Sequence, residues 1–429
     1  MKRITLLALI LIFALACPFT FAQTTGSGAT AAPDQVHLSW TGNPSTTMAV
    51  TWRTDAATRA GMVEYAKGPT LSTTVRRLAA TSTNFTTDLG ATRLFAVNLT
   101  GLSPNTQYCY RVGNGNQHWS AAHTFSTAEA KTDKVKFLIF GDSQSSATGE
   151  SPYGQWSTTV HNAYKANRDA KFMVNVGDLV DVGQNGAHWN AWFAAAAGVV
   201  DTIPEMPVVG NHETTPVKPS RKPSYWVAQF TLPQNGPNSL KSQVYSYDYG
   251  PVHIAVLDSQ QAEEKAFGDL FGPEKAWLEA DLAASKATWK LVFFHKAVYE
   301  QHPTRKSADV KAAFCPTIEA QHADLVFNGH DHGVARTYPI KDGVLKKKPS
   351  EGTVYCLVGR SGSKAYSNLV KKPWNTFLYS PTDQPNYQVV EIDGKKLTMR
   401  AVKQDGTPIS SFYIDKAKDV DSDCLPAGG

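Results

Sequence analysis

Hydrophobic positions along the chain follow two patterns, and the change between them falls near residue 130. From Pro33 to about Thr127, short segments alternate apolar and polar residues, as strands with one buried face do, and turn residues separate them. Strands at this spacing predict an all-β sandwich of the immunoglobulin type. The clearest alternating segments are Val36–Trp40, Met48–Trp52, Leu94–Val97 and Gln107–Val112.

A polar linker from Thr127 to Asp133 leads into a region in which apolar runs alternate with helical stretches. Because the runs are apolar on both faces, we expect their strands to form a central sheet that helices cover. The predicted helices are Trp156–Asn167, His188–Ala197 and Pro273–Ala287. The predicted strands lie in Val135–Phe140, Phe172–Val176, Val208–Val209, His253–Leu257, Leu291–Phe294 and Leu325–Phe327.

The first residues have the pattern of a secretory signal peptide. Lys2 and Arg3 precede an apolar run that ends at Cys17, and small residues lead to a cleavage point after Ala22. The run is shorter than the roughly 20 apolar residues that a membrane span needs, and no later segment is long and apolar enough. We therefore expect removal of residues 1–22, a flexible leader over 23–32, and a secreted or periplasmic protein. A lipid anchor on Cys17 is the less favoured alternative.

Composition and charge exclude several classes of protein. With 42% hydrophobic and 18% charged residues, the chain has the composition of a globular protein and not of a disordered one. The net charge of +5 is too small to indicate binding to nucleic acid or to an anionic membrane. Four cysteines follow the signal peptide, and three pairings are open to them. They are Cys109, Cys315, Cys356 and Cys424.

Five of the apolar runs end in polar motifs that carry the candidate chemistry. Side chains just past the carboxyl ends of neighbouring strands converge on one crevice, and we expect the repeated glycines to let the chain turn sharply there. The motifs are Gly141-Asp142-Ser143-Gln144, Gly177-Asp178-Leu179-Val180-Asp181, Gly210-Asn211-His212-Glu213, His295 and Gly329-His330-Asp331-His332.

The side chains of these motifs are those of a metal site. Two carboxylates, one amide and three imidazoles form a mixed donor set that suits Mn, Fe, Zn or Co better than Ca. They exceed the needs of one tetrahedral ion, so a pair of ions sharing one carboxylate fits their number. We predict two divalent metal ions as cofactors, with Fe, Zn or Mn as candidates. The predicted ligands are Asp142, Asp178, Asn211, His295, His330 and His332.

The ordered motifs GD, GDxxD, GNHE, H and GHDH resemble the calcineurin-like metallophosphoesterase superfamily. The preceding region is similar to the N-terminal, fibronectin type III-like domain of purple acid phosphatases, notably at residues 33–39 and 102–113, where Tyr108 occupies the position of a tyrosine corner. The resemblance implies a sandwich over residues 33–127 and an α/β metallophosphatase domain over 134–416. In that domain, two packed sheets are flanked by helices in the order α-β-β-α, and a tail follows at 417–429.

The resemblance also implies a role for each residue of the motifs. Asp178 would bridge the two ions. The other ligands would divide between the ions as Asn211, His295 and His330 on one side and Asp142 and His332 on the other.

Three further residues would support the reaction. His212 would act on the substrate as general acid, Glu213 would orient His212, and Asp331 would support the neighbouring ligands.

The second motif departs from the purple acid phosphatases, which carry a ligating tyrosine where this chain has Asp181. In other branches of the superfamily, the first motif supplies a histidine where this chain has Gln144. Asp181 and Gln144 are therefore both candidates for the last coordination position. Without the tyrosine that stabilises ferric iron, we expect a colourless site of two divalent ions.

These assignments predict a metal-dependent phosphatase that hydrolyses small phosphate monoesters by in-line attack of a metal-bridging hydroxide. His302 and Arg360 are additional candidates for contact with the substrate. Two alternatives stay open: a phosphodiesterase or nucleotide hydrolase with the same metal core, and a noncatalytic surface-binding protein with a vestigial metal site. The oligomeric state is open as well.

Overall fold

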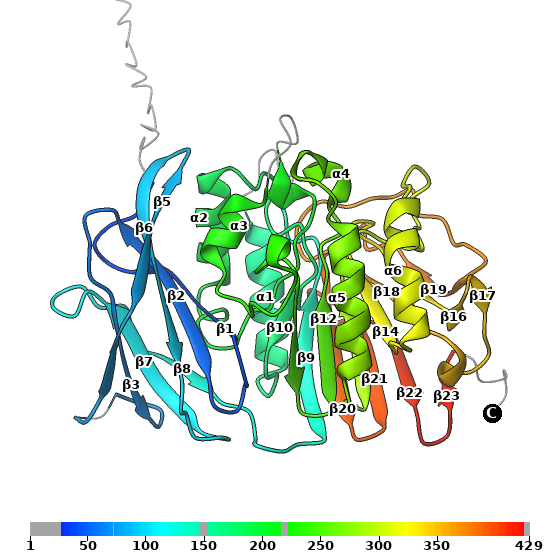
Figure 1. The fold of residues 1–429 in the computed structure, drawn as a ribbon, viewed down its shortest axis with the longest axis horizontal. Helices are drawn as coiled ribbons and strands as arrows, with labels where there is room; N and C mark the ends of the chain where they lie inside the picture. Colours follow the sequence, from blue (N-terminus) through cyan, green and yellow to red (C-terminus); the bar gives the residue numbers. More distant parts are fainter. Residues whose placement is uncertain (1–26, 72, 146–152, 216–221, 424–429) are drawn as a thin grey trace, which may run out of the picture.

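A computed structural model of the chain describes residues 27–71, 73–145, 153–215 and 222–423. The predicted signal peptide and Cys424 lie outside these residues, as does the first part of the predicted leader. A β-sandwich lies beside a larger α/β domain (Figure 1). Within the described part of the chain, no helix has both the length and the apolar character needed to cross a membrane.

The sandwich consists of two four-stranded antiparallel sheets, as the alternating segments predict. The first sheet contains, in spatial order, β1 (Asp34–Ser39), β2 (Met48–Asp55), β6 (Gly90–Leu99) and β5 (Thr81–Thr87). The second contains β4 (Arg76–Ala79), β3 (Met62–Lys67), β7 (Gln107–Gly113) and β8 (His123–Ser126). The Tyr108 hydroxyl accepts a hydrogen bond from the Ser103 N–H at 2.8 Å, which closes the tyrosine corner that the sequence indicates.

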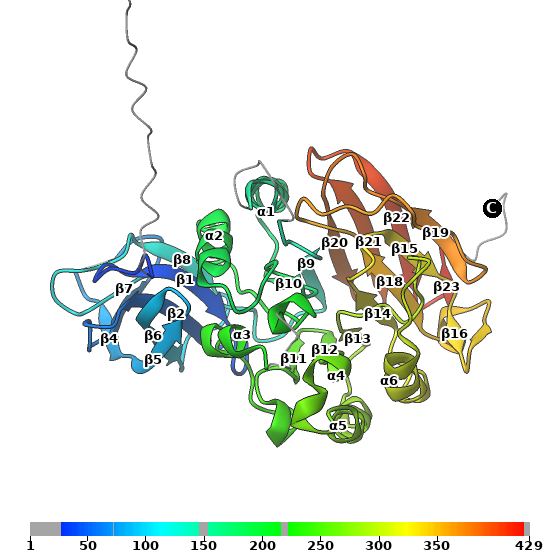
Figure 2. The same ribbon diagram turned by 90° about the horizontal axis from the view of Figure 1, so that it is seen from above.

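The α/β domain contains two larger sheets that pack against each other (Figure 2). The six-stranded sheet has the order β10 (Met173–Asn175), β9 (Lys134–Phe140), β20 (Asn386–Asp393), β21 (Lys396–Lys403), β22 (Pro408–Asp415) and β23 (Val420–Asp421). The seven-stranded sheet has the order β11 (Tyr245–Tyr249), β12 (Val252–Val256), β13 (Trp289–Phe293), β14 (Leu325–Asn328), β18 (Val354–Val358), β15 (Val334–Thr337) and β19 (Asn375–Tyr379). A small hairpin, β16 (Ile340–Lys341) and β17 (Val344–Leu345), lies apart from both.

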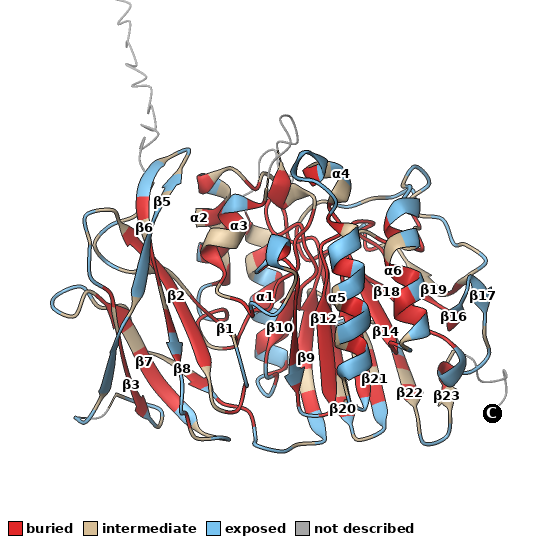
Figure 3. Cartoon of the chain, in the orientation of Figure 1, coloured by how far each residue is buried: buried red, intermediate tan, exposed pale blue. Residues whose placement is uncertain are grey.

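Helices cover the outer faces of the two sheets, so the predicted α-β-β-α order is confirmed (Figure 2). On the side of the six-stranded sheet are α1 (Gly154–Ala166) and α2 (Gly186–Ala196), and on the other side are α5 (Phe271–Ala284) and α6 (Ala308–Ala320). Figure 3 shows that the strands between them are buried along most of their length. Short helices occur at α3 (Ser224–Gln229), α4 (Gln261–Glu264), η1 (His212–Thr214), η2 (Asn238–Leu240), η3 (Lys265–Phe267) and η4 (Pro349–Glu351).

One predicted strand and one predicted domain boundary differ from the structure. Val208–Val209 is not a strand: it runs beside β10, where the Val208 N–H donates to the Asn175 carbonyl at 2.8 Å, but it is too short to form a ladder. The predicted tail contributes β23, which pairs with β22, and Asp423 forms an ion pair with Arg336. A two-residue strand has no periodicity that a sequence pattern could reveal.

The sandwich contacts the α/β domain close to the loops that carry the site. In β1, the Leu38 N–H donates to the Val200 carbonyl, and the Leu38 carbonyl accepts from the Glu205 N–H, both at 2.8 Å. At the β5–β6 turn, the Asp88 carboxylate accepts from the Gly186 N–H at 2.7 Å, at the start of α2. Gly183, three residues earlier, donates its N–H to the His212 carbonyl at 2.8 Å.

Candidate metal centre

The six predicted ligands meet where the two sheets of the α/β domain face each other. Each follows the carboxyl end of a strand or, for Asn211, the short extended segment at Val208–Val209. All are buried except Asn211, which is half-buried. Asp142 follows β9, Asp178 follows β10, His295 follows β13, and His330 and His332 follow β14.

The ligand atoms form two groups that share one carboxylate. Asp178, His295 and His330 make one group, and Asp142, Asp178 and His332 make the other. Within each group, the candidate ligand atoms lie within 4.8 Å of one another. The Asn211 Oδ1 lies 3.2 Å from the His295 Nε2, beside the first group. This is the division, with Asp178 in the middle, that the family resemblance implies.

Two imidazoles are fixed by backbone carbonyls so that their other nitrogen faces the centre. The His295 Nδ1–H donates to the Val176 carbonyl at 2.8 Å, and the His332 Nδ1–H donates to the Lys364 carbonyl at 2.6 Å. Each Nε2 therefore offers a lone pair, as a metal ligand must. The His295 Nε2 lies 3.2 Å from the Asp178 Oδ2, and the His332 Nε2 lies 3.1 Å from an Asp142 oxygen.

His330 presents its Nδ1 to the centre, 3.1 Å from the His295 Nε2. Its Nε2 lies 2.5 Å from an Arg305 guanidinium nitrogen, which can only donate a hydrogen bond. A histidine that binds a metal through Nδ1 carries its proton on Nε2. Ligation by His330 therefore requires Arg305 to withdraw from this nitrogen.

Several of the ligands themselves have a left-handed backbone conformation, next to the glycines that were expected to let the chain turn sharply. Of the motif glycines, Gly177 has a positive φ, at 85°. Gly210 is required for another reason: a Cβ there would lie 2.1 Å from the Asp178 nitrogen. Positive φ is costly for residues other than glycine, and such strain clusters at functional sites. The ligands with positive φ are Asp142 (47°), Asp178 (52°), His330 (69°) and His332 (55°).

Charge in the centre is arranged to hold a buried anion among imidazoles. Burial opposes ionisation of Asp178, but His295 and His212 together hold its pKa well below the usual range. Burial lowers the pKa of His295, yet Asp178 outweighs it and raises that pKa to about 9. Burial also holds the pKa of His330 well below its usual value. A buried carboxylate that stays ionised favours a cation beside it, which is the proton of His295 when no metal is bound.

Among the described residues, the Glu213 carboxylate makes no hydrogen bond to His212, the residue that it was predicted to orient. This buried carboxylate instead accepts hydrogen bonds from four backbone N–H groups around the second and third motifs. The donors are Gly210 (2.7 Å), Leu179 (2.8 Å), Asp178 (2.9 Å) and Val180 (3.3 Å). Burial raises the pKa of Glu213 to about 8, although the four donors favour the carboxylate. Glu213 therefore shapes the loop that presents Asp178.

His212 is oriented by a backbone carbonyl. Its Nδ1–H donates to the Asp181 carbonyl at 2.6 Å, and its Nε2 lies 3.8 Å from the Asp178 Oδ2. Since 20% of its side chain is exposed, a substrate can reach it. Asp331 is fully buried and accepts hydrogen bonds from the N–H groups of Gln301 (2.5 Å) and His302 (3.0 Å). It thereby ties the loop after His295 to the motif of His330.

Gln144 and Asp181 lie in different surroundings. The Gln144 amide is buried 3.2 Å from the Asp178 Oδ2, and its Oε1 has no hydrogen-bond partner among the described residues. Asp181 turns its carboxylate to the Tyr153 hydroxyl, 3.4 Å away, and burial raises its pKa. The Gln144 amide thus lies beside the shared carboxylate through its Nε2 and also has a buried oxygen without a partner, which favours Gln144 as the additional ligand.

The two predicted substrate contacts lie beside the centre in different ways. The buried guanidinium of Arg360 donates to the carbonyls of Pro381 (2.8 Å) and Gly362 (2.7 Å), so it braces the loop that borders Asp142. His302 is half-buried, and its ring centroid lies 5.0 Å from that of Tyr366.

Sequence reasoning missed three residues that border the crevice: Arg305, Lys364 and Tyr366. Arg305 donates to the Tyr366 hydroxyl at 3.1 Å, and the Tyr366 ring lies 4.5 Å from that of His332. The Lys364 Nζ lies 3.2 Å from the His212 Nε2. The signal for Lys364 was present, because its loop follows the apolar run of β18 just as the ligand loops follow their strands.

The described cysteines are unpaired and buried: Cys109, Cys315 and Cys356. Each thiol lies in the interior, and burial raises the pKa of each. Free thiols in such surroundings act as small apolar side chains.

Comparison with known families matches both domains. Residues 33–127 match the family described as "Purple acid Phosphatase, N-terminal domain", and residues 135–334 match "Calcineurin-like phosphoesterase". The chain belongs to the purple acid phosphatase-like metallophosphoesterases. It is therefore a metal-dependent phosphoesterase, with the two predicted domains in the predicted order.

Relatives of this family align over most of the chain. "Purple acid phosphatase 21" of Arabidopsis thaliana is 28% identical over 80% of this chain and 74% of its own length. "Acid phosphatase type 7" of Mus musculus is 26% identical over 89% and 90% of the two chains. The structure of a purple acid phosphatase from yellow lupin (Lupinus luteus) seeds superposes with a TM-score of 0.73. It covers 93% of this chain and 78% of the lupin chain at 20% identity, which shows a shared fold.

Proposed function

We propose that the chain hydrolyses small phosphate monoesters at a centre of two divalent metal ions. The observation that carries this proposal is the pair of ligand groups that share Asp178. A carboxylate common to two such groups is the arrangement that holds two ions about 3.5–4 Å apart in hydrolytic enzymes.

The residues present fit such ions. Mixed oxygen and nitrogen donors suit Fe, Zn or Mn, and Gln144, whose amide lies beside Asp178, has an unsatisfied Oε1 that could serve as a further oxygen donor. Bound divalent ions supply Lewis-acid polarisation of the phosphoryl group and activation of water near neutral pH. Asp178 would bridge them, with Asn211 and the imidazoles completing the two shells.

The chain's own contribution to bond cleavage comes from His212. Its ring is held by the Asp181 carbonyl, so Nε2 faces the crevice beside Asp178. From there it can protonate the ester oxygen as the bond to phosphorus breaks, and the alcohol then leaves neutral. General acid catalysis of this kind contributes roughly 10²–10⁴-fold.

We assign the remaining coordination position to Gln144 rather than Asp181. Metal titrations of Gln144→Ala and Asp181→Ala test this choice as a matched pair. The first substitution should weaken binding of one ion on the order of tenfold or more, and the second should weaken it less. If Asp181→Ala weakened metal binding more than Gln144→Ala, Asp181 would be the ligand at this position.

Export is part of the proposal, because residues 1–22 have the pattern of a signal peptide. Expression of the full chain in a secreting host should release a protein that begins at or near Gln23. N-terminal sequencing of the released protein checks this, and recovery of an intact Met1 would contradict it.

A substrate panel with released phosphate as the readout tests the function itself. Purified protein loaded with Zn, Mn or Fe is assayed on monoesters such as phenyl phosphate, on diesters and on nucleotides. We expect monoesters to have the highest kcat/KM. A preference for diesters would identify a phosphodiesterase, and metal occupancy without hydrolysis of any ester would favour the noncatalytic alternative.

A further inference from the structure

Lys364 reaches into the crevice from the loop after β18, opposite the loop of His212. Its backbone carbonyl accepts the Nδ1–H of His332, and its side chain crosses to His212, where Nζ lies 3.2 Å from Nε2. The backbone of this residue thus holds one metal ligand, while its ammonium lies beside the general acid. A substitution of the side chain leaves the carbonyl in place.

The hydrogen bond between the two side chains has one possible direction. In the neutral ring, His212 donates from Nδ1 to the Asp181 carbonyl, so its Nε2 is an acceptor; when Nε2 carries the proton that the general-acid step transfers, the hydrogen bond from Lys364 is broken. The Lys364 ammonium has three N–H groups, and one of them is directed to that nitrogen. Among the described residues, no hydrogen-bond acceptor is recorded for the other two, so a ligand on the same side of the crevice can accept them.

The two cations of the crevice differ in how far protein groups neutralise them. Arg305 lies 3.7 Å from an Asp331 oxygen and donates to the His330 carbonyl and the Tyr366 hydroxyl, each at 3.1 Å. Lys364 has no carboxylate oxygen within 4.0 Å among the described residues, and its charge acts on Asp181 only from further away. Lys364 is a half-buried residue, and a charge that is partly withdrawn from water is costly without a counter-charge.

We propose that Lys364 is a specificity-determining residue that binds a second negatively charged group on the leaving side of the scissile bond and so raises activity on phosphoanhydrides relative to that on simple monoesters. This rests on the proposed function, in which His212 marks the leaving side. The leaving group of a simple alkyl or aryl phosphate carries no charge of its own. In a phosphoanhydride, the leaving group is a second phosphate, whose oxygens can accept hydrogen bonds from the Lys364 ammonium.

The spacing of the crevice agrees with such a ligand. The His212 Nε2 lies 3.2 Å from the Lys364 ammonium and 3.8 Å from the Asp178 carboxylate. Both charged groups are therefore close to the same nitrogen, and we expect a ligand with two joined phosphoryl groups to contact the ligand cluster with one and Lys364 with the other. Water attacks the first phosphorus, the bridging P–O bond breaks, and the second phosphate leaves with that oxygen and its electron pair.

The test compares two hydrolysis-resistant ligands, methylenediphosphonate and methylphosphonate, by calorimetry on the metal-loaded full chain. Lys364→Met should lower the affinity ratio of the first to the second on the order of 10- to 100-fold, the value of one charge-assisted hydrogen bond. Lys364→Arg should keep most of the ratio. Lys371→Met, an exposed lysine seven residues further on, is the matched control and should leave both affinities unchanged.

Parallel kcat/KM values for pyrophosphate and phenyl phosphate should show the same fall in ratio. Metal content and melting temperature measured on each variant establish that the site is intact. Equal losses for both ligands in Lys364→Met, or no loss, would overturn the assignment. A different result would refute the proposed function: a wild-type protein that hydrolyses no ester. In that case the difference in affinity for the two phosphonates would still decide the role of Lys364.

Discussion

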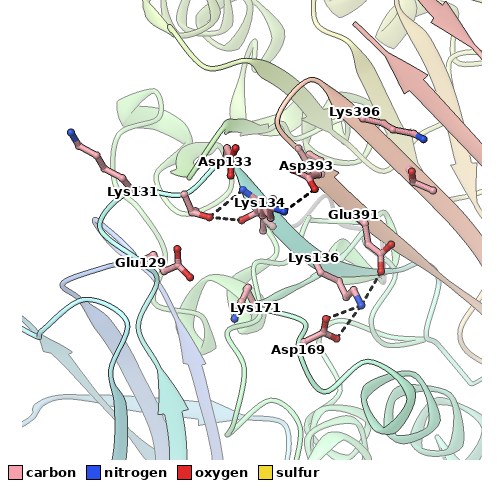
Figure 4. Close-up of a pocket in the computed structure, with 14 residues that line it drawn as sticks. Glu129, Lys131, Asp133, Lys134, Lys136, Asp169, Lys171, Glu391, Asp393 and Lys396 are labelled. Carbon is pink, nitrogen blue, oxygen red and sulfur yellow. Dashed lines mark hydrogen bonds and ion pairs between the residues drawn. The ribbon is translucent and has the colours of Figure 1, made fainter. Parts of the chain in front are cut away.

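Two regions of the α/β domain gather charged side chains, at opposite edges of the same sheet. One is the crevice around Asp178, and the other is a groove of about 950 Å³ between the start of β9 and the β20–β21 turn (Figure 4). β9 connects them: Lys134 begins the strand in the groove, and Asp142 follows its other end, roughly 20 Å away.

The charges of the groove neutralise one another on an exposed surface. Lys136 lies 2.8 Å from both Asp169 and Glu391, and Lys134 lies 2.9 Å from Asp393 (Figure 4). Exposed pairs of this kind contribute about 0–1 kcal/mol and leave no net charge for a ligand. In the crevice, most ligand side chains are buried, several ligand residues have a left-handed backbone, and buried oxygens of Gln144 and Asp331 are unsatisfied among the described residues. The candidate site is therefore distinguished by side chains that converge on one point and are buried. The volume of a groove and the number of charged residues that line it do not distinguish it.

The largest expected effect is that of Asp178→Ala. Because this carboxylate belongs to both ligand groups, its loss should empty the centre of metal and lower kcat/KM on the order of 10³-fold or more. Metal analysis by mass spectrometry and a phosphate-release assay measure both effects. Asp393→Ala, an aspartate of the groove, is the matched control and should change neither. Retention of two ions by the Asp178 variant would refute the shared ligand.

The second largest effect is that of His212→Ala, which separates metal binding from proton transfer. We expect full metal content and a fall in kcat of roughly 10²–10⁴-fold on alkyl phosphates. The fall should be smaller for 4-nitrophenyl phosphate, since its leaving group needs less protonation. A loss that is the same for both leaving groups would remove His212 from the role of general acid.

Glu213→Ala tests whether the Glu213 carboxylate stabilises the loop that presents Asp178. The substitution leaves four backbone N–H groups without their acceptor, so we expect a loss of about 2–4 kcal/mol in the free energy of unfolding. Denaturant titration of the metal-free protein measures it. Glu279→Ala, an exposed position on α5, should change stability by less than about 0.5 kcal/mol. Equal values for the two variants would show that Glu213 does not hold the loop.

The smallest effect is expected in the groove. Lys136→Ala breaks two exposed ion pairs, so stability should fall by no more than about 1 kcal/mol and kcat/KM should stay at the wild-type value. Steady-state kinetics and a thermal melt check this. A tenfold loss of activity would show that the groove takes part in the reaction. It would contradict the distinction between the catalytic crevice and the groove.

The sequence predicts the ligands of the centre better than it predicts their supports. Strand-end motifs place Asp142, Asp178 and the histidines, because parallel strands bring their carboxyl ends to one edge. The role of Glu213 could not be predicted, because a carboxylate that accepts hydrogen bonds from backbone N–H groups produces no recognisable pattern in the sequence. Lys364 was missed although its loop follows an apolar run, because a lone lysine in a loop is usually solvated.

The same limit applies to the fold. The alternating strands of the sandwich and the apolar runs of β9, β13 and β14 were predicted, since periodicity reports burial directly. Helix α6 was missed because Pro316 lies inside it, and proline normally ends a helix. Strands β20–β22 were missed as well, and they complete the six-stranded sheet by antiparallel pairing. These strands carry no motif of candidate ligands that would identify them in the sequence.

The central claim, two ions held around Asp178, is tested most directly by metal stoichiometry. The wild-type chain is stripped with a chelator and titrated with Zn or Mn while heat and phosphate release are recorded. We predict binding of two ions per chain, with full activity only after the second ion is bound. Saturation at a single ion, or full activity after the first, would contradict the shared-ligand centre.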